Sequence, residues 1–288
     1  MEKIIDLHIH TNVSDGVLSP KEVIDMAVEN GASVIAIADH DTIDAYNDEL
    51  FDYAEENNLI LVPAVEISTR TKKCGIHVLG YNFDFKDEKF REELNKLRNA
   101  RHDYLYEVAS KIEKLGYVVN VSKLDKIDAV TKAHIANDII SNTKNKELLT
   151  EKFGHIPNKG EFIETIMNEN CPAYVKKRSI SPREAAELIR SAGGKAVLAH
   201  PVAYKYEDGL TDDDILDLVN DMEVDAIEAS YHYVDRNDNR IEESEYWKEF
   251  ANKHNLLCSV GSDFHLDDGI RPVIGFKNWD IEFSRRYL

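Results

Sequence analysis

Residues 4–11 read Ile-Ile-Asp-Leu-His-Ile-His-Thr, a short apolar run that ends in two histidines. A run of this length, rich in Ile and Leu, predicts a buried β-strand over Ile4 to Ile9. Residues two apart on a strand point to the same side, so His8 and His10 can bind one metal ion. This stretch therefore predicts both the first strand of the fold and a chelating pair at its end.

Further apolar runs alternate with amphipathic helical stretches along much of the chain. The runs that predict strands are Ser33–Ala38, Leu59–Val65, Ile76–Tyr81, Lys195–Ala199, Ala226–Ala229 and Leu256–Val260. Helices are predicted over Lys21–Asn30, Ala45–Asn57 and Arg183–Ala192. Their start signals are Ser19-Pro20, Asp44 and Ser181-Pro182, residue types that are favoured at helix N-termini. This alternation is typical of parallel βα units.

The alternation stops between Asp84 and Cys171, where a long charged helix over Lys86–Leu115 precedes further helical stretches. We interpret residues 84–171 as a helical insertion whose basic side chains mostly lie on solvated helix faces. Residues 1–83 and 172–288 then form one α/β barrel. We expect the insertion to cover the mouth of the active site.

Composition and charge exclude several classes of protein. The 288 residues are 43% hydrophobic and 31% charged, which is ordinary for a globular chain. The chain has 54 acidic and 35 basic residues, and its net charge of −19 opposes binding to an extended nucleic-acid duplex or to an anionic membrane. Three cysteines, an odd number spread along the chain, favour a reducing compartment. With no signal peptide and no apolar run near the roughly 20 residues of a membrane span, we expect a cytoplasmic protein.

Side chains that can bind metals follow the predicted strand ends. Beyond the first pair, they are Asp39, His40, Glu66, His77, His200, Asp263 and His265. The carboxyl ends of parallel barrel strands share one rim, so these residues are expected to meet in space. Imidazole with carboxylate suits Zn, Mn or Fe better than Ca or Mg, and the lack of thiolates in the pattern disfavours a structural zinc site. The sequence therefore predicts a catalytic, partly open metal centre.

Two other positions have alternative interpretations. Cys74 could pair with His77 as a ligand, although a small apolar thiol that enters a strand is the simpler interpretation. Glu228 and His232, near the end of the predicted sixth strand, are left open as rim residues that could contact a substrate.

The motifs at the strand ends are similar to those of a known family. They are Asp6-Leu-His8-Ile-His10-Thr11, Ser14-Asp15-Gly16, Asp39-His40-Asp41-Thr42, Glu66, His77-Val-Leu-Gly80, Ala199-His200-Pro201 and Gly261-Ser-Asp263-Phe-His265. With these motifs in this order, the chain resembles the PHP (polymerase and histidinol phosphatase) family of metal-dependent phosphoesterases. The resemblance implies an α/β fold, a distorted (β/α)7 barrel with a helical insertion. The spacing is closest to the stand-alone branch that acts on nucleotides and RNA ends.

The resemblance also implies two to three divalent ions, Mn, Fe or Zn, and a division of the ligands among them. One ion would take His8, His10, Glu66 and Asp263, and a second would take Asp15, His40 and His265. Glu66 would bridge to a third ion held by His77 and His200, which makes a trinuclear centre. The residues by themselves predict the cluster and leave this division open.

A substrate phosphate needs cationic partners, and the resemblance implies candidates for them. They are Arg101, Lys132, His134 and Arg178. Relatives in this branch often have Arg-Pro-His where this chain has Lys132-Ala133-His134. Lys is a point charge without the planar fork of Arg, so phosphate affinity and orientation are expected to differ here. Whether His134 binds a metal or a phosphate stays open.

The implied activity is hydrolysis of a phosphate ester of a small nucleotide, such as a nucleoside 3′,5′-bisphosphate, or of a short RNA end, by a metal-activated hydroxide. Glu66, His200 and His265 would be the catalytic residues. A histidinol phosphatase or another small-molecule phosphomonoesterase is the alternative, and the complete ligand set disfavours a non-catalytic binding module. An aromatic wall that stacks on a nucleotide base would distinguish the nucleotide phosphoesterase from the small-molecule phosphomonoesterase. The tyrosines available for it are Tyr104, Tyr174, Tyr204 and Tyr231. The oligomeric state stays open.

Overall fold

The structure is a computed structural model, and it describes residues 4–125, 130–176, 179–235, 239–267, 269, 273–276 and 281–288. For Arg101, His232 and Ile281 it describes the backbone alone. The chain divides into two compact units, one of residues 1–95 with 179–288 and one of residues 96–178. We name them the sheet unit and the helical unit.

The sheet unit is built on seven strands in the order β1-β2-β3-β4-β5-β6-β9. Their bounds are β1 Ile4–Ile9, β2 Ala32–Ile37, β3 Ile60–Arg70, β4 Gly75–Tyr81, β5 Lys195–Leu198, β6 Ala226–Ser230 and β9 Leu257–Val260. All the predicted strands are confirmed, with ends displaced by a few residues. A separate antiparallel pair, β7 His232–Val234 and β8 Arg240–Glu242, follows β6 and is not among the predicted elements.

The sheet is parallel in its two outer parts and antiparallel in the middle. β1, β2 and β3 run parallel, and so do β5, β6 and β9. β4 is antiparallel to both β3 and β5, so the expectation of parallel strands throughout is wrong for β4. The reason is the short connection of residues 71–74. It allows a hairpin but is too short for the helical crossover that parallel neighbours need.

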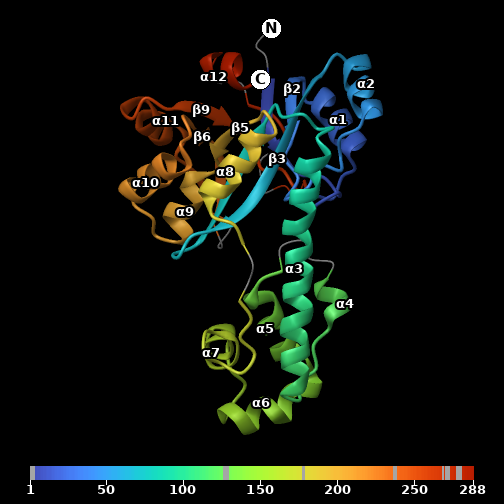
Figure 1. Cartoon of the computed structure of the whole chain (residues 1–288), viewed down its shortest axis with the longest axis vertical. Coiled ribbons are helices and arrows are strands. Elements are labelled where there is room, and N and C mark those ends of the chain that lie inside the picture. Colours follow the sequence, from blue (N-terminus) through green and yellow to red (C-terminus); the bar gives the residue numbers. More distant parts are fainter. Residues whose placement is uncertain are drawn as a thin grey trace. The chain divides into compact units, whose positions relative to one another are not determined.

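Apolar strand residues and surrounding helices form the core of the sheet unit. Ile5, Leu7 and Ile9 of β1 are at most 1% exposed. Figure 1 shows helices around the sheet, and the contacts place α1 on β2, α2 on β3 and α8 on β4 and β5. The helices of this unit are α1 Pro20–Glu29, α2 Asp48–Glu56, α8 Pro182–Ser191, α9 Pro201–Glu207, α10 Asp212–Met222, α11 Ser244–Lys253 and α12 Ile281–Tyr287.

Helix starts follow from local side-chain chemistry. Ser19 and Ser181 are the N-caps of α1 and α8, each in a capping box with a glutamate three residues on, which confirms the prediction from the Ser-Pro pairs. α2 instead begins after Asn47, whose side chain accepts a backbone N–H of the first turn. The predicted start after Asp44 is therefore wrong, because Asn47 is the residue that satisfies the free N–H groups of this helix.

The helical unit has a hydrophobic core of its own. Its elements are the greater part of α3 Glu88–Lys114, α4 Val121–Leu124, α5 Lys132–Ser141, the 3₁₀ helix Thr143–Asn145, α6 Lys146–Phe153, α7 Lys159–Phe162 and the π-helix Ile163–Met167. Val108, Ile135 and Phe162 are buried together in this core. The chain divides inside α3 rather than at residue 84, because Phe90 at the start of α3 packs on Phe83. None of the helices in the described part of the chain combines the length and apolar composition needed to cross a bilayer.

Candidate metal centre

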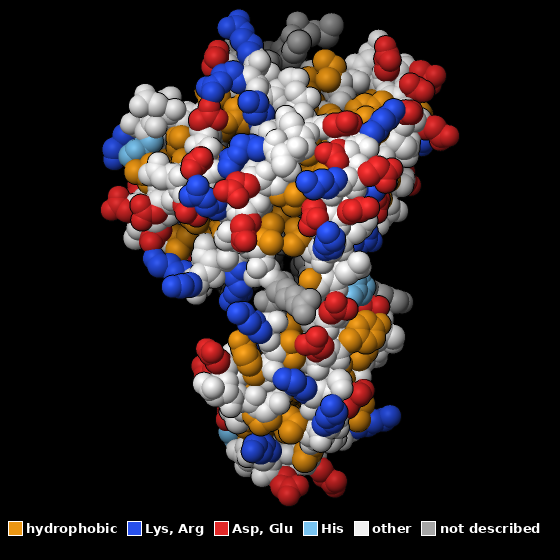
Figure 2. Space-filling model, in the orientation of Figure 1, with side chains coloured by type: hydrophobic (Ala, Val, Ile, Leu, Met, Phe, Trp, Pro, Cys, Tyr) orange, Lys and Arg blue, Asp and Glu red, His pale blue; other side chains and the backbone are white. Residues whose placement is uncertain are grey.

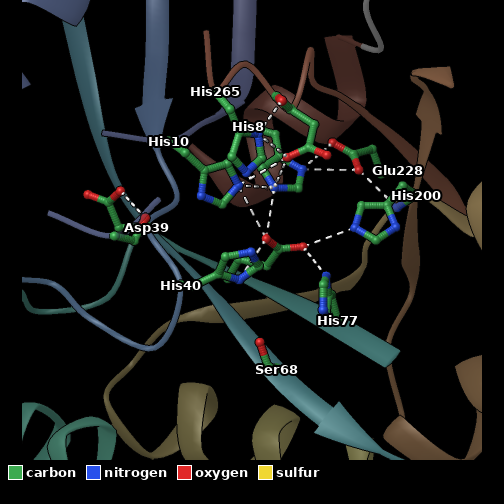
Figure 3. Close-up of polar contacts among 12 residues, drawn as sticks. His8, His10, Asp39, His40, Ser68, His77, His200, Glu228 and His265 are labelled. Atoms are coloured by element: carbon green, nitrogen blue, oxygen red, sulfur yellow. Dashed lines mark hydrogen bonds and ion pairs between the residues drawn. The ribbon is translucent and has the colours of Figure 1, made fainter. Parts of the chain in front are cut away.

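Histidine and carboxylate side chains from many strands converge in the sheet unit (Figure 3). The strands themselves supply His8 and His10 from β1, Glu66 from β3 and His77 from β4. The segments after strands supply Asp15 after β1, His40 after β2, His200 after β5, and Asp263 and His265 after β9. The structure thus brings together the residues for which the sequence predicts a metal-ligating role.

Glu66 lies at the centre of the cluster and is 1% exposed. Its Oε2 atom lies 3.1 Å from His40 Nδ1 and 3.3 Å from the Nε2 atom of each β1 histidine. Its Oε1 atom lies 2.8 Å from His77 Nδ1 and 3.0 Å from His200 Nε2. The two oxygens of one carboxylate therefore face two different sets of histidines.

Two further carboxylates complete the cluster. Asp263 Oδ1 lies 3.0 Å from His10 Nε2, and Asp15 Oδ2 lies 3.2 Å from His265 Nε2. Three groups of potential ligands result, with the atoms of each group within 4.8 Å of one another. The groups are His8, His10, Glu66 and Asp263; His10, Asp15, His40 and His265; and His40, Glu66 and His77. His200 contacts Glu66 but belongs to none of these groups.

The direction of β4 explains how His77 reaches the cluster. His77 is near the beginning of β4, whereas parallel strands contribute residues from their ends. Because β4 runs in the opposite direction, its beginning lies beside the end of β3, where His77 pairs with Ser68. The N–H of His77 also donates to the Tyr204 hydroxyl oxygen at 2.8 Å. The hairpin therefore places His77 beside Glu66, and α9 holds its backbone.

The donor set fits divalent transition metals. His8 Nε2 and His10 Nε2 lie 3.1 Å apart, and oxygens of Glu66 and Asp263 lie within 3.4 Å of both. The lone pairs of two neutral imidazoles repel each other at this distance, so a proton or a metal ion is needed between them. Nitrogen and oxygen donors of this kind are the ones that Zn, Mn and Fe accept.

The charges of the cluster favour cations. Burial raises the pKa of the Glu66 carboxyl, but the neighbouring histidines outweigh it and hold that pKa well below its usual value. Burial lowers the pKa of His10, but hydrogen bonds to Asp263 and Glu66 outweigh it and raise that pKa to about 10. For His40 burial dominates and lowers the pKa to about 3. A metal ion that binds His10 would therefore compete with a proton for this ring.

Two candidate ligands lie at strained backbone positions. The φ angle is 23° at His200, which precedes Pro201, and 52° at Asp263. Non-glycine residues in sparsely populated regions cost about 1–3 kcal/mol each and are concentrated at functional sites. The surrounding contacts thus hold both residues in conformations that the isolated chain disfavours.

Asp39 supports the loop that carries Asp15. Its Oδ1 atom accepts from the Thr11 N–H at 2.7 Å and from the Ser14 hydroxyl at 2.6 Å. Its Oδ2 atom accepts from the Thr11 hydroxyl at 2.7 Å. An added Cβ at Gly16 would lie 2.5 Å from a carbonyl oxygen of the neighbouring backbone, so close packing of this loop requires glycine. The sequence placed Asp39 among the strand-end side chains expected to meet at the metal centre, but Asp39 belongs to none of the three ligand groups.

Glu228 and Tyr231 contact candidate ligands from the side of β6. Glu228 is 0% exposed and lies 3.0 Å from His8 Nδ1, so burial rules out the possibility that it contacts substrate from the rim. The Tyr231 hydroxyl donates to Asp263 Oδ2 at 2.9 Å. The side chain of His232 lies outside the described part of the chain. In the sequence, Glu228 stands out only as a polar residue at a strand end. The candidate ligands show the same pattern, so the sequence cannot distinguish their roles.

The predicted phosphate-binding residues belong to the helical unit or lie outside the described residues. Lys132 and His134 are in the first turn of α5. Lys132 Nζ donates to Asn168 Oδ1 at 3.0 Å, and His134 Nδ1 accepts the N–H of the N-cap residue at 3.3 Å. The side chain of Arg101 and the whole of Arg178 are outside the described part of the chain. Contact of these residues with a phosphate stays a prediction.

Burial decides which tyrosines can stack on a base. Tyr104 is 4% exposed and Tyr204 is 5% exposed, so neither can form an aromatic wall. Tyr174 is half-buried, with Lys132 Nζ 5.7 Å from its ring centroid. Tyr231 is also half-buried, and its ring centroid lies 5.3 Å from that of His200. In the sheet unit, Tyr231 is therefore a candidate that lies beside the cluster and stays partly accessible.

Comparison with known proteins relates the chain to phosphate chemistry. The profile of the PHP domain matches residues 6–192. A 5′-3′ exoribonuclease from Haemophilus influenzae is 33% identical over 274 residues, which cover 93% of this chain and 92% of that protein. A 3′,5′-nucleoside bisphosphate phosphatase from Chromobacterium violaceum is 25% identical, with 93% of this chain and 90% of that protein covered.

A solved structure shows the same fold. An amidohydrolase from Chromobacterium violaceum superposes with a TM-score of 0.67, and the match covers 98% of this chain and 95% of that one. The sequence identity is 24%, so this likeness concerns the fold alone.

Proposed function

The chain belongs to the PHP domain family, and on this basis we propose that it is a metal-dependent phosphoesterase that hydrolyses a phosphate ester of a small nucleotide or of a short RNA end. The observation that carries the proposal is Glu66, whose two oxygens each face a separate set of histidines within 3.3 Å. The relatives named above include an exoribonuclease and a nucleoside bisphosphate phosphatase, which supports the substrate class.

The proposed centre holds two to three divalent ions, Mn, Fe or Zn. We assign His8, His10, Glu66 and Asp263 to the first ion, Asp15, His40 and His265 to the second, and Glu66, His77 and His200 to the third. The three ligand groups support the first two assignments most directly. When bound, such ions lower the pKa of a coordinated water to about 7 and stabilise the negative charge of a phosphoryl transition state.

We further propose that the sheet closes into a distorted barrel. Ile9 at the end of β1 forms an isolated bridge with Phe264, and the His10 N–H donates to the Phe264 carbonyl oxygen at 2.8 Å. Phe264 lies between Asp263 and His265 in the sequence. Closure at this point would hold ligands from the two ends of the chain at a constant separation.

Each proposed catalytic residue acts through a particular atom. Glu66 sets the separation of two ligand sets through its two oxygens. His265 Nδ1 donates to the Asp263 carbonyl oxygen at 2.8 Å, which leaves its Nε2 lone pair toward Asp15. His200 Nε2 lies 3.0 Å from Glu66, while its Nδ1 is buried without a hydrogen-bond partner among the described residues. A ring nitrogen that binds a metal cannot also carry a proton, so Nδ1 is the atom of His200 that holds one.

A phosphorylated substrate needs local positive charge on a chain of net charge −19. Figure 2 shows basic and acidic side chains interspersed over the visible face of the molecule. Divalent ions would supply concentrated positive charge at the cluster itself. Cationic side chains that bind a second phosphate would add to it.

Arg101, Lys132 and His134 are proposed to bind a substrate phosphate, with Arg178 as a further candidate. Lys132→Ala is expected to lower kcat/KM by about tenfold to a hundredfold, because one charge-assisted hydrogen bond contributes about 1.5 to 3 kcal/mol. The loss is expected to be larger on a nucleoside bisphosphate than on p-nitrophenyl phosphate, since the monoester has no second phosphate. Steady-state kinetics on both substrates measures this difference.

Lys144→Ala is the matched control, because Lys144 is an exposed lysine of the same unit. It should leave both substrates unaffected, and neither variant should change metal content. Equal losses on the two substrates in Lys132→Ala would indicate a structural role, and no loss on either substrate would overturn the proposed phosphate contact of Lys132.

A panel of substrates tests the proposed function. Nucleoside bisphosphates, mononucleotides, histidinol phosphate and short 5′-phosphorylated RNA are assayed with Mn²⁺ or Zn²⁺ added. We expect the highest kcat/KM on a bisphosphate or on the RNA. A preference for histidinol phosphate would support the small-molecule phosphatase instead, and no turnover on any member would overturn the proposal.

A further inference from the structure

We propose that Glu228 is a positioning residue of the metal centre, and that its one carboxylate orients the ring of His8 and the backbone of His200. The inference rests on the proposed metal site but does not depend on which phosphate ester is cleaved. Glu228 belongs to none of the three ligand groups. Its role therefore has to be read from what it touches.

The carboxylate of Glu228 contacts two partners, and its Oε2 atom, which also lies 3.2 Å from His8 Nδ1, is shared between them. Oε1 lies 3.0 Å from His8 Nδ1, and Oε2 accepts the His200 N–H at 2.9 Å. Figure 3 shows Glu228 beside both residues. An ionised carboxylate only accepts hydrogen bonds, so His8 carries a proton on Nδ1. In the neutral ring His8 Nε2 then has the free lone pair, and this atom faces the cluster, 3.3 Å from Glu66.

The contact is possible because residue 261 is glycine. Gly261 follows β9, and an added Cβ there would lie 2.2 Å from Glu228 Oε1 and 2.3 Å from His8 Cβ. Any side chain at this position would push the two residues apart. The φ angle of Gly261 is not among the positive ones, so it is the space and not the backbone conformation that requires glycine. The missing side chain at Gly261, just after β9, thus leaves the space in which Glu228 contacts His8.

Burial makes the arrangement specific. Glu228 and His8 are both 0% exposed, and a buried carboxylate is costly unless it is hydrogen-bonded and its charge is balanced. A metal ion on His8 Nε2 would balance this charge through the ring, as in the carboxylate–histidine–metal arrangements of other proteins. His8 contacts one oxygen of Glu66 and His200 contacts the other. Glu228 therefore links the two sides of the cluster.

Zinc binding to variants tests the proposal. Zn²⁺ alone is titrated into metal-free wild type, Glu228→Gln and Glu228→Asp in competition with a chelating dye. Both variants are expected to bind Zn²⁺ about tenfold to a hundredfold more weakly. In Glu228→Gln the amide nitrogen is a donor, but both partners, His8 Nδ1–H and the His200 N–H, are donors as well. In Glu228→Asp the side chain is shorter, so its carboxylate cannot reach both partners. Wild-type affinity in Glu228→Gln would overturn the proposal. Wild-type affinity in Glu228→Asp would also overturn it, because charge without reach would then suffice.

Asp138→Asn is the matched control. Asp138 is a carboxylate of the helical unit that is 7% exposed and accepts the Asn120 N–H at 2.8 Å. This change is expected to lower the melting temperature and to leave the affinity for Zn²⁺ unchanged. A comparable loss of affinity in this control would show that any buried carboxylate gives the effect, which would overturn a specific role for Glu228.

A measurement on the wild type decides the proposal even if the variants do not fold. In zinc-loaded protein with nitrogen-15-labelled histidine, NMR is expected to show a slowly exchanging proton on His8 Nδ1. The His8 signals are identified by comparison with His8→Asn. A proton on Nε2, or zinc on Nδ1, would overturn the proposal. If zinc binding depends on Glu228 but the substrate panel shows no hydrolysis, this inference holds and the proposed function fails.

Discussion

Replacing Glu66 by glutamine is expected to lower kcat/KM by about a thousandfold or more. Glu66 faces histidines with both oxygens at 2.8–3.3 Å, whereas an amide offers one oxygen and one nitrogen that donates. One of the two ligand sets then loses its carboxylate. Bound metals supply several kcal/mol of transition-state stabilisation, and each 1.36 kcal/mol is about tenfold in rate. Kinetics on the best substrate of the panel, with metal content measured in parallel, checks this result.

The same variant is expected to keep its fold. Glutamine has nearly the same shape as glutamate. Val65 and Ile67, the neighbours of Glu66 in β3, are fully buried in the core and are not altered by the change. Circular dichroism and the melting temperature measure this. Glu184→Gln, which alters only the capping box of α8 at the surface, is the control and should retain full turnover. Normal turnover in Glu66→Gln would rule out a bridging role.

Removal of metal ions by a chelator is expected to abolish hydrolysis and to lower the melting temperature. An ion that binds only the folded state stabilises it by about 2.7 kcal/mol at a concentration of 100 times Kd. Added Mn²⁺ should restore both quantities. Activity assays and calorimetry before chelation, after it and after re-addition measure the effect.

The stabilisation by metal is expected to increase with pH. Burial lowers the pKa of His10, but contacts to Asp263 and Glu66 outweigh it and raise that pKa to about 10, so a proton competes with the ion below this pH. In metal-free protein the contribution of His10 to stability changes with pH in the opposite direction. A histidine with a raised pKa stabilises the fold fully below its unfolded value of about 6.5, and this contribution is lost as pH rises through about 10. The difference in melting temperature between loaded and chelated protein should therefore grow from about pH 6 to pH 9.

A variant without the chelating pair provides the control for both metal experiments. The double change of His8 and His10 to alanine should make the melting temperature much less sensitive to chelator. Full activity after exhaustive chelation would contradict the metal requirement. A wild-type melting temperature that does not respond to added Mn²⁺ would contradict binding at this cluster.

Local patterns in the sequence by themselves determined the strands of the seven-stranded sheet, several helix starts and the residue types of the candidate metal cluster. The strand Ile4–Ile9 and the caps at Ser19 and Ser181 depend on contacts within a few residues, so spacing is enough to predict them. The meeting of His8 with Asp263 could also be predicted, because parallel strands bring their ends to a common edge.

Only the tertiary structure decided the direction of β4, the division of the chain inside α3 and the role of Glu228. Glu228 and His8 are 220 residues apart, and they meet through the space that Gly261 leaves. A carboxylate at a strand end gives the same sequence pattern whether it binds a metal or orients a histidine. The physical reason is that secondary structure depends on neighbours along the chain, whereas these contacts depend on which strands lie side by side and on the room between them.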